Sequence, residues 1–235
     1  MPVLDVASFV AREGEFITII GPSGCGKSTF LHIMGGFIPA EAGAIRVYGN
    51  AVNGPGPDRG MVFQEFALFP WKTVAGNVGW GLEAQGFKKE EIAETVGAYL
   101  ELMDLAQFRN HYPAEISGGM KQRVALARVL AFNPKVLLMD EPFGALDAQT
   151  RETMQEEVTR IWERTRKTIV FVTHDIEEAV FLGDRVVVLS ARPGGIREDI
   201  RIDLPRPRTL EIKKSARCHE YRNTIWDLIR SESKA

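Results

Sequence analysis

The run EFITIIGPSGCGKSTFLHIM, residues 15–34, decides the fold of this chain. Apart from Glu15, its first six residues are β-branched or apolar, and they predict a buried strand. Gly21, Gly24 and Gly26 follow, and they let the backbone take positive φ so that its N–H groups converge on phosphate oxygens. The last six residues continue as a helix whose N-terminus faces the phosphates. A strand before and a helix after favour a phosphate-binding loop over a plain glycine turn.

This loop supplies the predicted contacts with ATP and its Mg²⁺ ion. The ammonium of Lys27 lies on the β- and γ-phosphates, and the hydroxyl of Ser28 is the expected magnesium ligand. The predicted ATP-binding residues are Gly21, Pro22, Ser23, Gly24, Cys25, Gly26, Lys27, Ser28 and Thr29.

A second apolar strand, residues 136–139, ends in Asp140 and Glu141. Open α/β sheets place their ligands at the carboxyl ends of such strands. Asp140 is expected to hold magnesium directly or through water, and Glu141 to orient or deprotonate the attacking water. An acidic pair after a strand is also a common helix-capping signal. The phosphate loop elsewhere in the chain favours the catalytic interpretation.

A second glycine turn, Ser117-Gly118-Gly119-Met120, lies shortly before that strand. It opens a predicted helix from about Met120 to Ala131 that Ser117 caps. Taken alone, the turn is explained by capping. The functional alternative is that its N–H groups and hydroxyl grip a γ-phosphate. A helix dipole contributes about 0.3–1 kcal/mol and each charge-assisted hydrogen bond roughly 1.5–3 kcal/mol, so several bonds could distinguish ATP from ADP.

Together these motifs resemble the ATP-binding subunit of an ABC transporter, and the resemblance runs from about Val3 to about Arg208. In that family the second turn is a signature that meets the nucleotide held by another subunit. The resemblance therefore implies a head-to-tail dimer with a second nucleotide-binding subunit, most simply another copy of this chain. ATP closes this dimer and hydrolysis opens it. The family's usual motif has Gln where this chain has Met120, which leaves only a contact at that position in doubt.

Three further elements take their roles from the resemblance. Gln64 follows the strand 60–63 and looks like the Q-loop residue that senses magnesium and water. His174 follows the strand 168–173 and resembles the residue that donates a hydrogen bond to the γ-phosphate. A lone histidine at a strand end is most often a surface residue, and the Thr-His-Asp context favours the catalytic role. The D-loop at the dimer seam is identified by Ala145, Leu146 and Asp147, and Asp147 also fits a helix N-cap.

The predicted catalytic residues are thus Glu141, His174 and Gln64. The predicted magnesium ligands are Ser28, Gln64 and Asp140.

The expected fold class is α/β: a P-loop NTPase core with a mostly parallel sheet, a partial antiparallel β subdomain and an inserted α-helical subdomain. Residues 1–64 and 136–204 are assigned to the core, 65–135 to the helical subdomain with the signature, and 205–235 to a short tail with a helix around 221–229. Two apolar stripes predict packed helices. They are Ile92, Val96, Tyr99, Leu100 and Met103, and then Met154, Val158, Ile161, Trp162 and Thr165.

The segment 68–71, with Thr73-Val74 and Asn77-Val78 after it, is similar to the nitrate, sulfonate and taurine importer branch. A buried aromatic loop is the alternative interpretation of this stretch. The resemblance implies a separate polytopic membrane permease and, through it, a periplasmic or lipid-anchored solute-binding protein. It places the chain peripherally on the cytoplasmic face of the membrane. The transported solute is not encoded in these motifs.

Bulk properties agree with this interpretation. The chain has 235 residues, with 29 Lys and Arg, 31 Asp and Glu and a formal charge of −2. Such a balance argues against a nucleic-acid-binding protein, which usually carries a basic domain. No apolar stretch approaches the roughly 20 residues of a membrane span. Two cysteines provide no disulfide framework.

Other classes share some of these motifs. A non-transport ABC ATPase would need long coiled coils, zinc-ligand spacings or a second cassette, and none is present in the sequence. A different P-loop enzyme, such as a small-molecule kinase, would carry no signature turn. The ATPase of an exporter or lipid-extraction system is the closest alternative, because the core motifs do not report the direction of transport.

The family places an aromatic residue that stacks on adenine roughly twenty residues before the phosphate loop, a contact worth about 1–3 kcal/mol. Between Met1 and Gly21 we find no residue that matches this aromatic. Phe9 aligns instead with an interior position of a strand. We therefore expect in-frame codons upstream of Met1 that encode a short strand and a Tyr, Phe or Trp.

Overall fold

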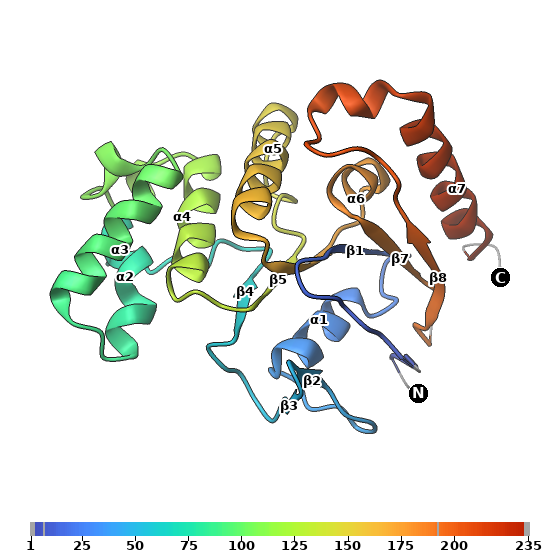
Figure 1. Ribbon diagram of the computed structural model, residues 1–235, viewed down its shortest axis with the longest axis horizontal. Coiled ribbons are helices and arrows are strands. Elements are labelled where there is room, and N and C mark those ends of the chain that lie inside the picture. Colours follow the sequence, from blue (N-terminus) through green and yellow to red (C-terminus); the bar gives the residue numbers. More distant parts are fainter. Residues whose placement is uncertain (1–2, 7, 192, 233–235) are drawn as a thin grey trace.

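A six-stranded sheet forms the centre of the computed structural model, which describes residues 3–6, 8–191 and 193–232 (Figure 1). Five strands run parallel, and the last one pairs antiparallel at the edge. The predicted α/β class with a mostly parallel sheet is confirmed. In spatial order the strands are β4 (Arg59–Val62), β5 (Val136–Asp140), β6 (Thr168–Val172), β1 (Phe16–Ile20), β7 (Arg185–Leu189) and β8 (Ile196–Arg201).

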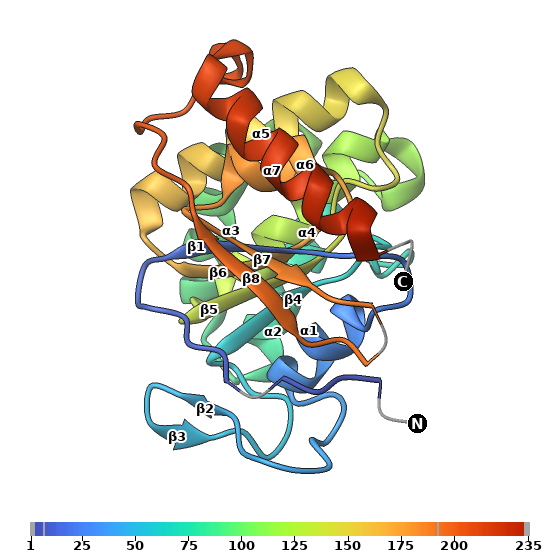
Figure 2. The same ribbon diagram turned by 90° about the vertical axis from the view of Figure 1, so that its right-hand side faces the viewer.

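Strand β1 lies near the middle of this sheet because all five of its residues are apolar or β-branched and buried. Successive side chains of a strand point to opposite faces. On one face Ile17 and Ile19 pack with Leu31 of helix α1 (Lys27–Gly35). On the other face Phe16 contacts Trp162 of helix α5 (Ala148–Thr165), with ring centroids 6.0 Å apart. Helices therefore cover both faces of the sheet (Figures 1 and 2).

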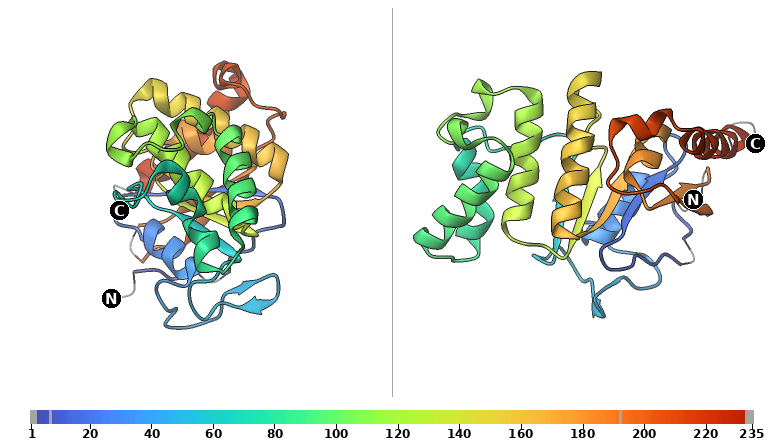
Figure 3. Two further views of the ribbon diagram at one scale, coloured as in Figure 1. Left: turned by 90° about the vertical axis from the view of Figure 1, so that its left-hand side faces the viewer. Right: turned by 45° about the horizontal axis from the view of Figure 1, so that its top comes forward.

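Three helices form a lobe beside the β4 edge of the sheet (Figure 3). They are α2 (Val74–Ala84), α3 (Lys89–Leu102) and α4 (Gly118–Ala131), with 3₁₀ turns η1 (Ala106–Phe108) and η2 (Pro113–Glu115) between the last two. Val96, Leu100 and Met103 are buried in the interface of this lobe. A separate hairpin of β2 (Arg46–Val47) and β3 (Asn50–Ala51) follows α1. No helix in the described ranges is long and apolar enough to cross a lipid bilayer.

Two helices begin earlier than the sequence predicted. Helix α4 starts at Gly118 instead of about Met120, because Ser117 caps it directly. Helix α7 spans Ala216–Glu232 instead of about 221–229. Its added first turn is supported by Ser215, whose hydroxyl accepts from the N–H of Cys218 at 3.2 Å. The 3₁₀ helix η3 (Leu210–Lys214) precedes it, and α6 (Ile176–Leu182) packs against both.

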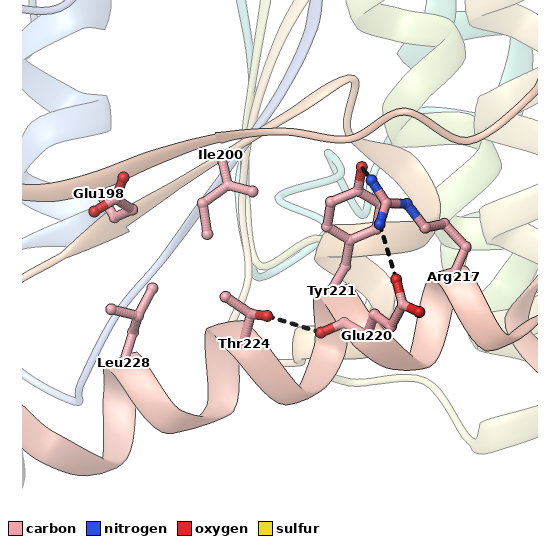
Figure 4. A pocket seen from close by; sticks show the side chains of 7 residues that line it. All are labelled: Glu198, Ile200, Arg217, Glu220, Tyr221, Thr224 and Leu228. Atoms are coloured by element: carbon pink, nitrogen blue, oxygen red, sulfur yellow. Dashed lines mark hydrogen bonds and ion pairs between the residues drawn. The ribbon is translucent and has the colours of Figure 1, made fainter.

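A shallow groove lies between β8 and α7 (Figure 4). Ile200 and Leu228 supply apolar lining, and Arg217 pairs with Glu220 at 2.8 Å along its rim. Arg217 also lies over the ring of Tyr221. The groove contains none of the residues of the nucleotide-binding motifs.

Candidate functional site

The phosphate loop leaves β1 and ends where α1 begins. Gly24 and Gly26 have φ of 74° and 100°, a left-handed backbone that strains residues with a Cβ atom. Gly26 is the N-cap of α1 and provides no side-chain acceptor for the first turn. The N–H groups there remain available as donors, and the positive end of the helix dipole adds to them. This cradle fits a polyphosphate.

Lys27 is only 7% exposed, although its charge needs a partner. Its Nζ donates to the carbonyl oxygens of Gly21 and Pro22, both at 3.0 Å. A phosphate oxygen is a stronger partner for an ammonium than a neutral carbonyl. Cys25 beside it is buried, and burial raises the pKa of its thiol, so this side chain packs as an uncharged group.

Ser28 and Asp140 meet although 112 positions separate them in the sequence. The Ser28 hydroxyl donates to Asp140 Oδ1 at 2.9 Å. Burial raises the pKa of the Asp140 carboxyl, and the bond from Ser28 and the charge of His32, whose Nε2 lies 3.9 Å from Oδ2, oppose that rise. Carboxylate and hydroxyl oxygens are donors that magnesium prefers. The pair therefore fits a magnesium ion.

Glu141 and His174 form a second polar pair at the next position along the site. Glu141 Oε2 lies 2.8 Å from His174 Nδ1, and the His174 side chain is mostly exposed. Glu141 has φ of 42°, in the left-handed region where a glutamate is strained. Its N–H donates to the carbonyl of Val172 on β6, which ties this backbone to the neighbouring strand. Such strain at an acid beside a phosphate cradle is typical of a functional position.

Gln64 reaches the same pair from the end of β4. The side chains of Gln64 and Glu141 both lie close to Gly144. A Cβ atom added at Gly144 would lie 3.8 Å from Gln64 Nε2 and 4.0 Å from Glu141 Oε2. The structure thus gathers Gln64, Glu141 and His174 into one region. Their assignment as catalytic residues, and that of Gln64 as a magnesium ligand, stays a prediction.

The Ser117 turn differs from the phosphate loop in its surroundings. Ser117 is exposed, and its Oγ accepts from Met120 N at 3.3 Å. Gly118 is exposed as well, whereas Gly119 is buried against α5. A Cβ atom on Gly119 would lie 2.6 Å from Thr150 Cγ2. The turn therefore packs beside the residues that follow Glu141 and presents its hydroxyl outward.

Those following residues form the predicted D-loop, in which Ala145 and Asp147 are exposed and Leu146 is buried. Asp147 caps α5 by accepting from the N–H of Thr150 at 3.0 Å and from its hydroxyl at 2.6 Å. These bonds lower the pKa of the Asp147 carboxyl. Arg151 donates to the carbonyl of Leu146 at 3.1 Å. The loop thus has a fixed backbone and an outward-facing surface.

Comparison with known proteins decides the family. A family model described as ABC transporter matches residues 4–144. The chain belongs to the ABC transporter family. It therefore binds and hydrolyses ATP, and the predicted relationship to importer ATP-binding subunits is confirmed at the level of sequence similarity.

This ABC transporter chain has relatives with named roles. It is 51% identical to the nitrate import ATP-binding protein NrtD of Synechocystis over 225 residues, 93% of this chain and 85% of the relative. It is 50% identical to the taurine import ATP-binding protein TauB of Rhizobium johnstonii over 203 residues, 86% of this chain and 78% of the relative. The dimeric structure of MJ0796, a bacterial ABC transporter cassette, aligns with a TM-score of 0.74 and 34% identity over 86% of this chain and 92% of that chain.

Sequence reasoning missed a cation that binds the loop after Gln64 in this ABC transporter chain. Arg128 on α4 donates to the carbonyls of Ala67 and Phe66 at 2.6 and 3.2 Å, and its guanidinium lies over the ring of Phe69. Burial lowers the pKa of Arg128. The available signal was a charged residue within a run of buried apolar positions. Its partners, about sixty positions away, had no local signal.

Proposed function

We propose that this chain is the ATP-hydrolysing subunit of an importer that takes up a small solute, with nitrate, sulfonates and taurine as the candidate class. Identities of 51% and 50% to nitrate and taurine import ATP-binding proteins, over 93% and 86% of the chain, carry this proposal. The loop after Gln64 supports it. Trp71 is 72% exposed there and lies near Phe69, which contacts Trp80 at 4.9 Å between ring centroids. We assign this aromatic surface to contact with the membrane permease.

Magnesium in this proposal is held by oxygen ligands. Ser28 and Asp140 supply a hydroxyl and a carboxylate, and Gln64 supplies an amide oxygen. When bound, the ion neutralises charge on the β- and γ-phosphates. Lys27 exchanges its two backbone carbonyls for phosphate oxygens, which makes its hydrogen bonds charge-assisted at both ends.

Hydrolysis then needs a base and an aligned water. Glu141 accepts a proton from the water while the oxygen of that water bonds to the γ-phosphorus. The bond between the γ-phosphorus and the β,γ-bridging oxygen breaks, which gives ADP and phosphate. His174 lies 2.8 Å from Glu141. A protonated His174 donates from both ring nitrogens, so it can hold Glu141 and a γ-phosphate oxygen together.

The Ser117 turn belongs, in this proposal, to the nucleotide of a second copy of the chain. Ser117 and Gly118 are exposed at the start of α4, so they can donate to a γ-phosphate brought by that copy. The D-loop, with Asp147, lies beside this turn at the same seam. ATP closes the dimer, and loss of the γ-phosphate opens it.

The assembly we propose is peripheral on the cytoplasmic face of the membrane. Two copies of this chain bind a polytopic permease, which receives its solute from a periplasmic or lipid-anchored binding protein. Each closing and opening of the ATP dimer is passed to the permease through the loop after Gln64.

A reconstituted transport assay tests this function. Affinity-tagged Glu141→Gln protein with ATP should retain a polytopic membrane protein, which is then identified and placed in vesicles with the wild-type chain and the matching solute-binding protein. ATP should drive accumulation of labelled nitrate, taurine or an alkanesulfonate, and Glu141→Gln should remove it. ATP-driven movement in the opposite direction would overturn the importer assignment. Absence of any membrane partner would overturn the transport role.

A further inference from the structure

Helix α6 carries a buried carboxylate that the proposed hydrolysis does not use. Glu178 is 4% exposed, and its Oε1 accepts from Gln155 Nε2 on α5 at 2.9 Å. Burial raises the pKa of Glu178, and its hydrogen bonds oppose that rise. A buried carboxylate depends on such donors, because an unpaired one is costly. The donors to Glu178 therefore hold their own segments of the chain in place around it.

The two residues next to His174, Thr173 and Asp175, both interact with Glu178. The hydroxyl of Thr173 accepts from Asp175 N at 3.0 Å, and Thr173 is among the groups that lower the pKa of the Glu178 carboxyl. Asp175 in turn accepts from Glu178 N at 3.1 Å. Thr173 therefore acts on the side chain of Glu178, whereas Asp175 is bonded to its backbone N–H. The position of the His174 ring depends on this turn.

A charge from the D-loop side also acts on this carboxylate. Arg151 is among the charges that favour ionised Glu178, and it donates to the Leu146 carbonyl at 3.1 Å. The cation that supports the D-loop backbone therefore also stabilises ionised Glu178.

The C-terminal tail completes this network through Lys213 on η3. Lys213 Nζ donates to Gln155 Oε1 at 2.9 Å and lies 3.4 Å from Glu177 Oε1. The Lys213 side chain is only 10% exposed, and its ammonium lies over the Phe181 ring at 5.1 Å. The tail is thus anchored between α5 and α6 by a nearly buried cation.

Lys213 and Glu178 together determine which way the Gln155 amide points. An amide has one oxygen acceptor and one NH₂ donor, and the two ends can exchange by rotation. Lys213 donates to the oxygen and Glu178 accepts from the NH₂, so the amide is fixed at both ends. Without Lys213 the oxygen loses this donor, and the side chain is held toward Glu178 at one end only.

We propose that Lys213 is a positioning residue for ATP hydrolysis, which orients Gln155 toward Glu178 and so fixes the turn that carries His174. This inference rests on the proposed catalytic role of His174. It assigns the tail a role in the rate of the hydrolytic step, separate from the binding of ATP.

The test compares two neighbouring lysines in the full chain. Lys213→Met should lower kcat for ATP hydrolysis about tenfold, the effect of losing one charge-assisted hydrogen bond, and change KM for ATP less than about twofold. Lys214→Met is the matched control, because that side chain is 75% exposed and pairs with Glu211 on the surface. Lys213→Arg keeps a cationic donor and should restore most of kcat. Equal kcat in Lys213→Met and the control would overturn the proposal.

A double variant tests whether the effect passes through His174. In a His174→Ala background, Lys213→Met should lower the remaining rate by less than about twofold, because coupled residues are not additive. A full tenfold loss in that background would overturn the proposal. A wild-type rate in His174→Ala alone would instead overturn the proposed role of His174. If Lys213→Met fails to fold, Glu178→Asp tests the same path by shortening the carboxylate, and an unchanged kcat there would also overturn it.

Discussion

The chain contains two glycine turns that each open a helix, and their surroundings differ. In the phosphate loop, Gly24 and Gly26 take positive φ, and Lys27 lies nearly buried beside them. The Ser117 turn has an N-cap bond of its own, from Met120 N to Ser117 Oγ. Its Gly119 is required by the close approach of Thr150, and not by a left-handed backbone.

The difference indicates which turn can act alone. The phosphate loop has a cation, a carboxylate and a second acid within one chain, joined by the Ser28–Asp140 bond. The Ser117 turn is exposed and lies near Leu146 and Thr150, and the acid beside it, Asp147, is engaged in capping α5 through Thr150. This agrees with the proposal that the turn is half of a site, completed by a nucleotide held by another molecule.

The largest expected effect is on the rate of hydrolysis, in a variant that leaves both glycine turns unchanged. Glu141→Gln removes the water-activating carboxylate and leaves each cradle intact, so hydrolysis should fall about 100-fold to 10,000-fold while ATP still binds. The trapped complex should elute as a dimer in size-exclusion chromatography with ATP and magnesium. A variant that stays monomeric, or hydrolyses ATP at the wild-type rate, contradicts the shared-site account.

The next variant addresses the second turn alone. Ser117→Arg places a bulky cation where the γ-phosphate of the partner would lie, and hydrolysis should fall about 100-fold, as for the loss of a transition-state donor. ATP binding, measured with a fluorescent analogue, should stay near the wild-type value. Lys27→Ala is the contrast, because it should lose binding. If Ser117→Arg loses binding as well, the turn belongs to its own chain's site.

A smaller effect tests why the second turn contains glycine. Gly119→Ala should destabilise the chain by about 1–3 kcal/mol through overpacking, since its Cβ would meet Thr150 Cγ2 at 2.6 Å. Gly118→Ala is the control, because its Cβ would lie 3.7 Å from Leu146. Thr150→Ser removes the obstructing methyl group and should recover most of the loss. Equal melting temperatures for the two alanine variants would mean that packing does not explain the glycine.

The smallest effect concerns the Asp147 cap beside this turn. Hydrogen bonds from Thr150 lower the pKa of Asp147, so its contribution to stability is full above the ordinary value of 3.8 and is lost as the pH falls through the lower folded value. Asp147→Ala should therefore lower the melting temperature at pH 6 and do so less at pH 3. A difference that is constant across this range would assign the effect to something other than the carboxylate.

Local patterns were enough to predict four strands of the sheet, β1, β4, β5 and β6, and both glycine turns. Strand β1 is apolar along its length, and Ser117 is a standard capping residue. The start of α4 was placed two residues late because Gly118 and Gly119 suggest a flexible turn, although they form the first turn of the helix. The beginning of α7 was missed because its first residues, apart from the buried Cys218, are exposed and lack an apolar period.

Long-range partners could not be predicted from such patterns. Arg128 binds Ala67 across 61 positions, and Lys213 reaches Gln155 across 58. Lys213 does not differ locally from an ordinary surface cation, and the buried apolar run around Arg128 does not indicate which residues Arg128 binds. The spatial order of the strands, which brings β5 between β4 and β6, decides where Asp140 and Glu141 meet Gln64 and His174.

The central claim is that each ATP site combines the phosphate loop of one chain with the Ser117 turn of another, and a mixing experiment tests it most directly. Lys27→Ala and Ser117→Arg, each inactive alone, are mixed in equal amounts and assayed for hydrolysis. Half of the dimers should then be mixed and keep one intact site of two, so the rate should rise to at most about a quarter of wild type. A mixture no faster than the average of the two separate preparations would contradict the claim.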